Sequence, residues 1–543
     1  MKRRRARLRR PPPAGKPAVP CKPAVPCKLA APVSDADLHA TRSPLPQVCL
    51  QRPSTASRCS SRGGVRLQWR SGRTLAAAAA IVFASCTETA RGEFDASFTG
   101  ATLRIDYHHV GTATEEHFAL ERARIEGPWS GSRTRLIDTL NLGKYLAEVV
   151  DTATNRVIFS FGFASIYGEW ETTAEARSGV WRSLPEAVRV PEPRGAFQLR
   201  IRKRGADGQF REVWAVGIDP ASRFTDRAPL PQRDVWTVLE NGDPAVKVDI
   251  LILGDGYTKD ESSGFRADVT KVMDVFFATE PYASRKTDFN VRAIHAAAPY
   301  SGITRPRAGV FRDSPLAARY NTFDSERYVL TLDDRAWRDV AAAAPYDFVI
   351  ILVNERKYGG GGIFQLYCTA SASSAFASFL VLHEFGHHFA ALADEYYTSP
   401  VAYAKNDGKR REPWEPNVTA LSNAETLKWR DLVATRTPLP TPWPKDDYET
   451  QSRAFQAKRR TLREDGASEE AVEALFREEK SVVSELLGGH ENAGRVGAFE
   501  GAMYEARGYY RPSIDCIMFT RDDVGYCQVC RRAIERVIDR YTR

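Results

Sequence analysis

The sequence predicts two folded domains of different class, an antiparallel β-sandwich followed by an α/β (α+β) domain. Residues 93–219 contain short runs that alternate apolar and polar side chains, without a long helical stretch. Residues 235–543 contain continuous apolar strands separated by helical segments. Between them, PASRFTDRAPLPQRD at 220–234 has no hydrophobic period and is the predicted linker.

Within the first domain, the runs at 101–110, 145–163 and 196–218 have the period of β-strands. Asp207-Gly208 is typical of a hairpin turn inside the last of these runs. The domain is about 130 residues long, which is a common size for a β-sandwich. We therefore expect an accessory domain built from strands and tight turns.

In the second domain, strands are expected at 246–258, 289–297 and 346–354, and helices through Phe265–Phe277 and at 334–344. This alternation of strands and helices indicates a largely parallel sheet. The four glycines at 359–362 lack the lysine of a phosphate loop, so we interpret them as flexible backbone beside an edge strand. Mixed charges at helical spacing predict a solvated helical hairpin within an insertion at about 398–490.

The net charge of +9 is concentrated in the first part of the 543-residue chain. Residues 1–86 hold 17 of the 77 Lys and Arg and 2 of the 68 Asp and Glu. The rest of the chain therefore has 60 basic and 66 acidic residues, a net charge of −6. A nucleic-acid partner is not expected, because no basic surface remains to bind phosphates.

The basic leader has two parts. Residues 1–64 are rich in Arg and Pro and are expected to be disordered or a spurious extension. Residues 65–86 combine arginines, an apolar run from Leu75 to Ala84 and a final Cys86, as in a signal peptide. The ending FASC is similar to the lipoprotein type. We expect an exported protein that is periplasmic, extracellular or lipid-anchored at the cell envelope, with membrane attachment only through Cys86.

The stretch HEFGHHFAALADEYY at 383–397 contains the pattern HExxH. Two histidines four residues apart lie on one face of a helix, so His383 and His387 can bind the same metal ion. Glu384 is placed to accept a proton from the water that attacks a carbonyl. This pattern predicts one catalytic zinc ion with Glu384 as the general base, whereas His388 points off the ligand face.

A catalytic zinc usually has three protein ligands. On a straight helix Asp394 would lie about 10 Å along the axis from His387, too far for a carboxylate to reach the same ion. Asp394 can be the third ligand only if the helix breaks near residues 390–393 and the chain turns back. Glu395 and the distant Glu500 are the alternatives.

Four cysteines lie beyond the leader, Cys368, Cys516, Cys527 and Cys530. In an exported chain this even number allows two disulfides, with three connectivities. Cys527 and Cys530 form a CxxC pair, but no thioredoxin-like context surrounds it. We therefore expect a structural bridge rather than a redox pair.

HEFGHHFAALADEYY and the downstream FEGAMYEARGYYRPSIDCIMFTRDDVGYCQVC resemble the bacterial IgA-peptidase family of zinc metallopeptidases. The resemblance covers roughly residues 93–543 and includes the β-rich accessory domain. It implies a metzincin-like architecture and a Met-turn at Met518. It also implies a third zinc ligand shortly after the histidines, for which Asp394 is the preferred residue. Tyr509 or Tyr510 is the candidate donor to the oxyanion of the reaction.

The predicted function is a secreted or lipid-anchored zinc endopeptidase that acts on protein or peptide substrates, pairing them with an edge strand at 361–371. A second hypothesis is a surface-anchored protein that binds glycan or protein and keeps the metal domain as a structural or vestigial part. A third is another metal-assisted hydrolysis such as amide deacetylation. Glu384 favours the hydrolases, because a structural metal site needs no glutamate there. No motif specifies the cleavage preference or the oligomeric state.

Overall fold

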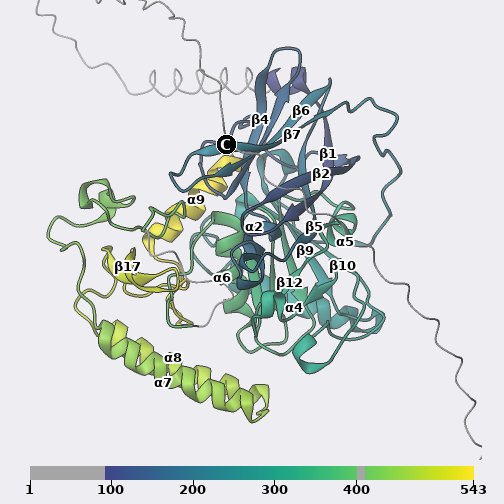
Figure 1. Ribbon diagram of the computed structural model, residues 1–543. Helices are drawn as coiled ribbons and strands as arrows, with labels where there is room; N and C mark the ends of the chain where they lie inside the picture. The colour runs from purple at the N-terminus through teal and green to yellow at the C-terminus, as the bar shows by residue number, and fades with distance from the viewer. Residues whose placement is uncertain (1–91, 400–409, 543) are drawn as a thin grey trace, which may run out of the picture. The chain divides into compact units, whose positions relative to one another are not determined.

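The computed structural model describes residues 92–399 and 410–542, all of them within one compact unit. The expected leader and signal segment, residues 1–86, lie outside the described residues. Within the described part, no helix is both long enough and apolar enough to cross a bilayer. Figure 1 shows the β-rich N-terminal region in purple and blue and the mixed region in teal to yellow.

The N-terminal region is an antiparallel two-sheet structure, as the sequence predicts. Its sheets have the strand orders β2-β1-β5 and β4-β3-β6-β7. The strands are β1 (Phe98–Gly111), β2 (Glu116–Pro128), β3 (Tyr145–Asp151), β4 (Arg156–Phe163), β5 (Arg182–Pro193), β6 (Phe197–Arg204) and β7 (Phe210–Ile218). Two short helices, α2 (Ile166–Trp170) and α3 (Ala174–Arg177), connect β4 to β5. The predicted hairpin turn is present between β6 and β7, where Gly208 has a φ of 78°.

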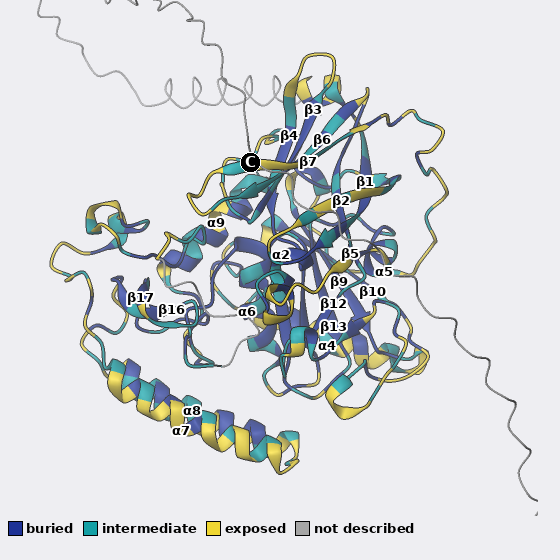
Figure 2. Cartoon of the chain, viewed as in Figure 1, coloured by how far each residue is buried: buried dark blue, intermediate teal, exposed yellow. Residues whose placement is uncertain are grey.

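The second domain is built on a six-stranded sheet in the order β14-β15-β13-β9-β10-β8. Strands β10, β9, β13 and β15 are parallel, and the two edge strands β8 and β14 run antiparallel to their neighbours. Figure 2 shows these central strands buried, which explains why their sequences are continuously apolar. The strands are β8 (Val235–Leu239), β9 (Val248–Asp255), β10 (Phe289–His295), β13 (Phe348–Val353), β14 (Gly360–Ile363) and β15 (Tyr367–Ser371).

Helices and smaller strands complete the second domain. The largest core cluster joins α4 and α6 to the sheet through residues such as Phe276, Phe348 and Phe385. Beyond the sheet strands, the elements are α4 (Ser262–Phe276), β11 (Ala318–Arg319), β12 (Leu330–Thr331), α5 (Asp334–Ala341), α6 (Ala377–Ala390), α7 (Lys445–Glu464), α8 (Glu469–Gly488), β16 (Phe499–Ala502), β17 (Glu505–Arg511) and α9 (Gln528–Thr542). The predicted fold class is confirmed.

The charged insertion contains the predicted helical hairpin, in which α7 and α8 pack against each other. Its outer side chains are solvated, but one face is buried. Phe476 of α8 packs against Tyr358 and Phe376, with ring centroids 5.3 and 5.6 Å away. The hairpin is therefore attached to the core rather than fully solvated.

Polar contacts hold the sandwich against the second domain. Arg104 on β1 pairs with Asp106 and Glu126 of its own domain and reaches Asp339 of α5 at 2.6 Å. The backbone N–H of Ala164 donates to the carbonyl oxygen of Phe364 at 3.0 Å. Because Phe364 directly follows β14, this bond fixes the start of the α2–α3 segment beside the edge of the sheet.

The glycines at 359–362 serve close packing, which corrects the interpretation as flexible backbone. A Cβ on Gly362 would lie 2.1 Å from the backbone oxygen of Glu384, and one on Gly361 would lie 2.6 Å from the ring of Tyr328. Neither glycine has a positive φ, so space rather than conformation excludes a side chain. Strand β14 can approach helix α6 because Gly362 has no side chain, and Gly361 leaves room for the ring of Tyr328.

Gly362→Ala should lower the free energy of unfolding by about 1–3 kcal/mol, because the methyl group forces β14 away from α6. Chemical denaturation of the full chain measures the change. Gly264→Ala is the matched control, since a Cβ there meets nothing within 4 Å on the exposed side of α4. Equal stability of both variants would contradict the close-packing explanation.

Candidate metal centre

Helix α6 carries the HExxH residues in a largely buried setting against β14 and β15. His383 and His387 lie one turn apart, and their Nε2 atoms are 3.2 Å from each other. His388 points elsewhere, where it accepts a hydrogen bond at Nε2 from the backbone N–H of Val349 and contacts the carbonyl of Ile363 through Nδ1. The helix thus separates the two candidate ligands from the neighbouring histidine, as the spacing predicts.

Backbone carbonyl groups orient both candidate ligands. Nδ1 of His383 lies 2.9 Å from the carbonyl oxygen of Ile517, and Nδ1 of His387 lies 2.5 Å from that of Leu392. A carbonyl oxygen only accepts, so each Nδ1 carries the proton and donates it. In the neutral ring, each Nε2 then has a lone pair that can bind a metal ion.

The chain reverses directly after α6. Ala391 adopts the left-handed conformation, with φ 56° and ψ 33°, and its N–H donates to the carbonyl of His387. The N–H of Leu392 donates to the carbonyl of Gly386, which closes the turn. As a result, Oδ1 of Asp394 lies 3.0 Å from Nε2 of His383 and 3.3 Å from Nε2 of His387.

These three donor atoms form a nearly equilateral triangle with sides of 3.0 to 3.3 Å. A tetrahedral zinc ion with bonds of about 2.0 Å to nitrogen and oxygen separates its ligand atoms by about 3.3 Å. The donor set of two imidazoles and one carboxylate is also one that zinc accepts. The residues present therefore fit a metal ion of this kind.

The alternatives for the third ligand point away from this triangle. Oε1 of Glu395 accepts a hydrogen bond from the side-chain amide of Asn417 at 2.9 Å and lies near Cys530. Glu500 on β16 pairs with Lys445 at 2.7 Å. Of the three acids that the sequence offers, the fold brings only Asp394 to the two histidines.

Electrostatics tie the triangle together. Burial opposes protonation of His387, but the charge of Asp394 outweighs this and raises the pKa of His387 to about 9. The same interaction lowers the pKa of Asp394 well below its ordinary value despite burial. Without a metal, the Asp394 carboxylate and the protonated His387 imidazolium are therefore held together as an ion pair.

Glu384 faces the cleft beside this triangle. Burial raises the pKa of Glu384 above its ordinary value, and the neighbouring histidines offset the effect only in part. A carboxyl group of this kind can both accept and return a proton closer to neutral pH than an exposed glutamate. Gly360 keeps this side of the carboxyl group open, since a Cβ there would lie 3.2 Å from Oε1 of Glu384.

Met518 lies under the helix. Its Sδ atom is 3.0 Å from the position of a Cβ on Gly386, and its carbonyl oxygen accepts a hydrogen bond from the N–H of Glu395 at 2.9 Å. The preceding carbonyl, that of Ile517, orients His383. The turn around Met518 therefore supports both the helix and the chain that carries Asp394.

The structure does not bring Tyr509 or Tyr510 to the cleft. Tyr509 packs in a small apolar cluster with Val418 and Ala502, and its hydroxyl accepts a hydrogen bond from the N–H of Arg411 at 3.4 Å. Tyr510 pairs with Thr419 through the backbone. The described residues that line the cleft include neither tyrosine, so the expected oxyanion donors are not where the reaction would occur.

Sequence reasoning missed Tyr504, Tyr396 and Arg327, which do line the cleft. The hydroxyl of Tyr504 donates to Oδ2 of Asp394, on the side away from the histidines. Arg327 donates to the hydroxyl of Tyr396 at 2.8 Å, and the ring of Tyr396 is stacked near that of His383. The tip of the β16–β17 hairpin places Tyr504, because the N–H of Met503 donates to the carbonyl of Asp394 at 3.0 Å.

The cleft in front of the triangle has a volume of about 640 Å³. One wall comes from β14 and a second from the β16–β17 hairpin. A third comes from the N-terminal domain, whose α2–α3 segment is held there by the bond between Ala164 and Phe364. The lining residues from that domain are Ala164, Glu169, Thr172 and Arg177.

A buried helix that presents His, Glu and His to an open cleft beside an edge strand is the plan of HExxH metallopeptidases. The comparisons with protein families agree with this class. Residues 237–538 match the model of IgA Peptidase M64, and residues 93–215 match that of the Peptidase M64 N-terminus. The chain belongs to the IgA peptidase M64 family and is a metallopeptidase, as the resemblance implies. No curated protein matches the chain.

Proposed function

We propose that this metallopeptidase is a zinc-dependent endopeptidase. His383, His387 and Asp394 would hold the ion, and the observation that supports this is the convergence of their three donor atoms at 3.0 to 3.3 Å. When bound, zinc supplies Lewis acidity, which polarises a carbonyl and makes water acidic enough to lose a proton near neutral pH. Glu384 takes that proton and returns it to the leaving amine.

Strand β14 gives the substrate a place to pair. At the outer edge of β14, the N–H of Gly360 donates to the carbonyl of Arg327, and the carbonyl of Gly360 accepts from the N–H of Val329. Polar backbone groups alternate in direction along a strand, so the N–H and C=O of Gly362 face the same outer edge. An extended peptide that pairs with Gly362 would pass in front of Glu384, because Gly362 lies against the backbone of that residue. This favours a peptide over a small amide as the substrate.

Export is part of the proposal and is supported by the signal-like sequence at 65–86. The protein would act at the cell envelope or outside it, with Cys86 as a lipid anchor if the segment is of the lipoprotein type. Globomycin treatment of an expressing bacterium, followed by mass measurement of the N-terminal peptide, tests this directly. An unprocessed N-terminus in the cytoplasm would contradict export.

Peptide cleavage tests the endopeptidase. The purified full chain should cut internal bonds in a complex peptide mixture, lose this activity with a chelator and regain it with added zinc. Mass spectrometry of the products gives the cleavage sites. A zinc-loaded protein that cuts nothing would overturn the proposal and favour a binding protein for glycan or protein.

Tyr504→Phe should weaken zinc binding by about 10- to 100-fold, because it removes the hydrogen bond that orients Asp394. Competition with a chromophoric chelator measures the affinity. Tyr509→Phe is the matched control and should bind zinc as the native chain does, since Tyr509 lies away from the cleft. Unchanged affinity together with a lower kcat would instead assign Tyr504 to the stabilisation of the oxyanion.

A further inference from the structure

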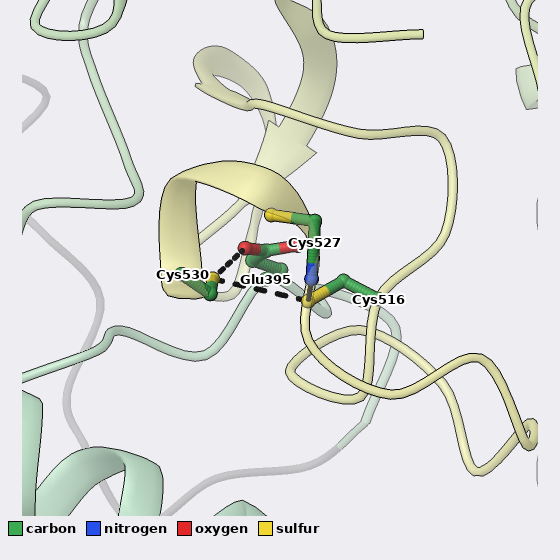
Figure 3. Close-up of side chains that lie close together, drawn as sticks. All are labelled: Glu395, Cys516, Cys527 and Cys530. Carbon is green, nitrogen blue, oxygen red and sulfur yellow. Dashed lines mark hydrogen bonds between the residues drawn. The ribbon is translucent and has the colours of Figure 1, made fainter. Parts of the chain in front are cut away.

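The three C-terminal cysteines and Glu395 meet in a second cluster, away from the cleft. Figure 3 shows Cys516, Cys527, Cys530 and Glu395 directed toward a common point. One sulfur atom from each cysteine and one carboxylate oxygen all lie within 4.8 Å of one another. The four residues come from three parts of the chain, so the tertiary fold assembles the cluster.

All four cysteines of the described residues are free thiols, which corrects the expectation of disulfide bridges. Cys368 is buried on β15 and takes no part in the cluster. The Sγ atoms of Cys516 and Cys530 are 3.8 Å apart. Three thiols cannot all be used by one bridge, so a disulfide would leave the third sulfur unbridged and would give Oε2 of Glu395 no partner.

Two distances in the cluster match those between the ligands of one zinc ion. A tetrahedral ion with bonds of about 2.3 Å to sulfur and about 2.0 Å to oxygen separates two sulfurs by about 3.8 Å and sulfur from oxygen by about 3.5 Å. The cluster has 3.8 Å between the sulfurs of Cys516 and Cys530, and 3.4 Å from Cys530 to Oε1 of Glu395. Four protein donors would fill the coordination sphere, as in structural zinc sites.

Burial supplies a second, independent observation. The side chain of Glu395 is completely buried, and among the described residues its Oε2 atom has no hydrogen-bond partner. A buried carboxyl group without compensation is costly, so such groups are normally paired or bound to a metal. Cys516 and Cys530 are also fully buried, which protects thiolate ligands from solvent and oxidants.

The CxxC segment is arranged as a ligand pair. Cys527 immediately precedes α9 and Cys530 lies in its first turn, so both sulfurs face the same point. The N–H of Cys527 donates to Sγ of Cys516 at 3.4 Å, a contact that stabilises negative charge on that sulfur. The N-terminal end of α9 also favours thiolates through its dipole.

We propose that Cys516, Cys527, Cys530 and Glu395 bind a second, structural zinc ion. Glu395 follows Asp394 directly, and the two acids point to opposite sides of the extended chain, one into each cluster. Cys516 lies two residues before Met518, whose carbonyl accepts from the N–H of Glu395. The second ion would tie α9, the turn around Met518 and the segment carrying Asp394 together, and would position Asp394 without touching the substrate.

Metal analysis of the full chain tests this inference independently of peptidase activity. The native protein, purified with zinc under reducing conditions, should contain two zinc ions per chain by elemental mass spectrometry. The His383→Ala/His387→Ala variant should contain one, and its cobalt form should show thiolate-to-metal charge-transfer absorption. The Cys527→Ser/Cys530→Ser variant should lose the ion of the cysteine cluster and keep the ion at His383 and His387. Cys368→Ser, which alters a buried cysteine outside the cluster, should keep both ions.

One zinc ion in the native chain and none in the double-histidine variant would overturn the inference. A disulfide among the three cysteines, found by counting free thiols in the denatured and unreduced protein, would overturn it as well. If the double-cysteine variant does not fold, the metal content and cobalt spectrum of the folded histidine variant still decide the question. Loss of cleavage with both ions bound would contradict the proposed function alone.

Discussion

Replacing Glu384 with glutamine should reduce peptide hydrolysis by roughly 10²- to 10⁴-fold, the usual contribution of a general base. Glutamine has nearly the same shape but cannot accept a proton from water. The donor triangle of His383, His387 and Asp394 does not include Glu384, so the metal content should stay unchanged. Cleavage kinetics and elemental analysis of the same preparation measure the two quantities.

Glu169→Gln provides the control for this experiment, because Glu169 also lines the cleft but comes from the N-terminal domain. It should retain most of the activity. If both variants were equally active, another group would have to serve as the base. If Glu384→Gln lost the metal, Glu384 would be a ligand rather than the general base.

Removal of the Asp394 side chain should have the second large effect. Asp394→Ala deletes one of three proposed ligands, so zinc affinity should fall by more than about 100-fold. This loss exceeds the one expected from removing a residue that only hydrogen-bonds a ligand, such as Tyr504. Activity should fall with it at limiting zinc. A zinc titration followed by cleavage of a model peptide measures both.

Glu500→Gln is the matched control, since Glu500 is the distant acid that the sequence also allows as a ligand and the fold pairs with Lys445. It should bind zinc as the native chain does. Normal zinc affinity in Asp394→Ala, or its loss in Glu500→Gln, would contradict the proposed ligand set.

Much of the scaffold was predictable because its signals are local. The buried strands β9, β10 and β13 appear as continuous apolar runs, and the expected strands coincide with them. The spacing of His383 and His387 places both on one helix face whatever surrounds the helix. The hairpin at Gly208 also follows from its own residues, since only a residue that tolerates positive φ suits that turn.

Other features depend on contacts between distant segments. The reversal after α6 occurs at Ala391, a residue that gives no signal for it, because alanine favours the helix and disfavours positive φ. Three backbone hydrogen bonds hold the reversed chain in place. The N–H groups of Leu392 and Met503 donate two of them, and the carbonyl of Met518 accepts the third. Tyr504 comes to Asp394 from more than a hundred residues away. No periodicity in the sequence records such a contact.

By itself, the sequence determined the class of each domain and the helix that presents His383, Glu384 and His387, because these depend on hydrophobic period and helical geometry. Only the tertiary structure decided that Asp394 joins the histidines while Glu395 turns toward the three cysteines. Adjacent side chains in extended backbone point in opposite directions, and the packing of the turn around Met518 and the β16–β17 hairpin selects which acid faces the cleft.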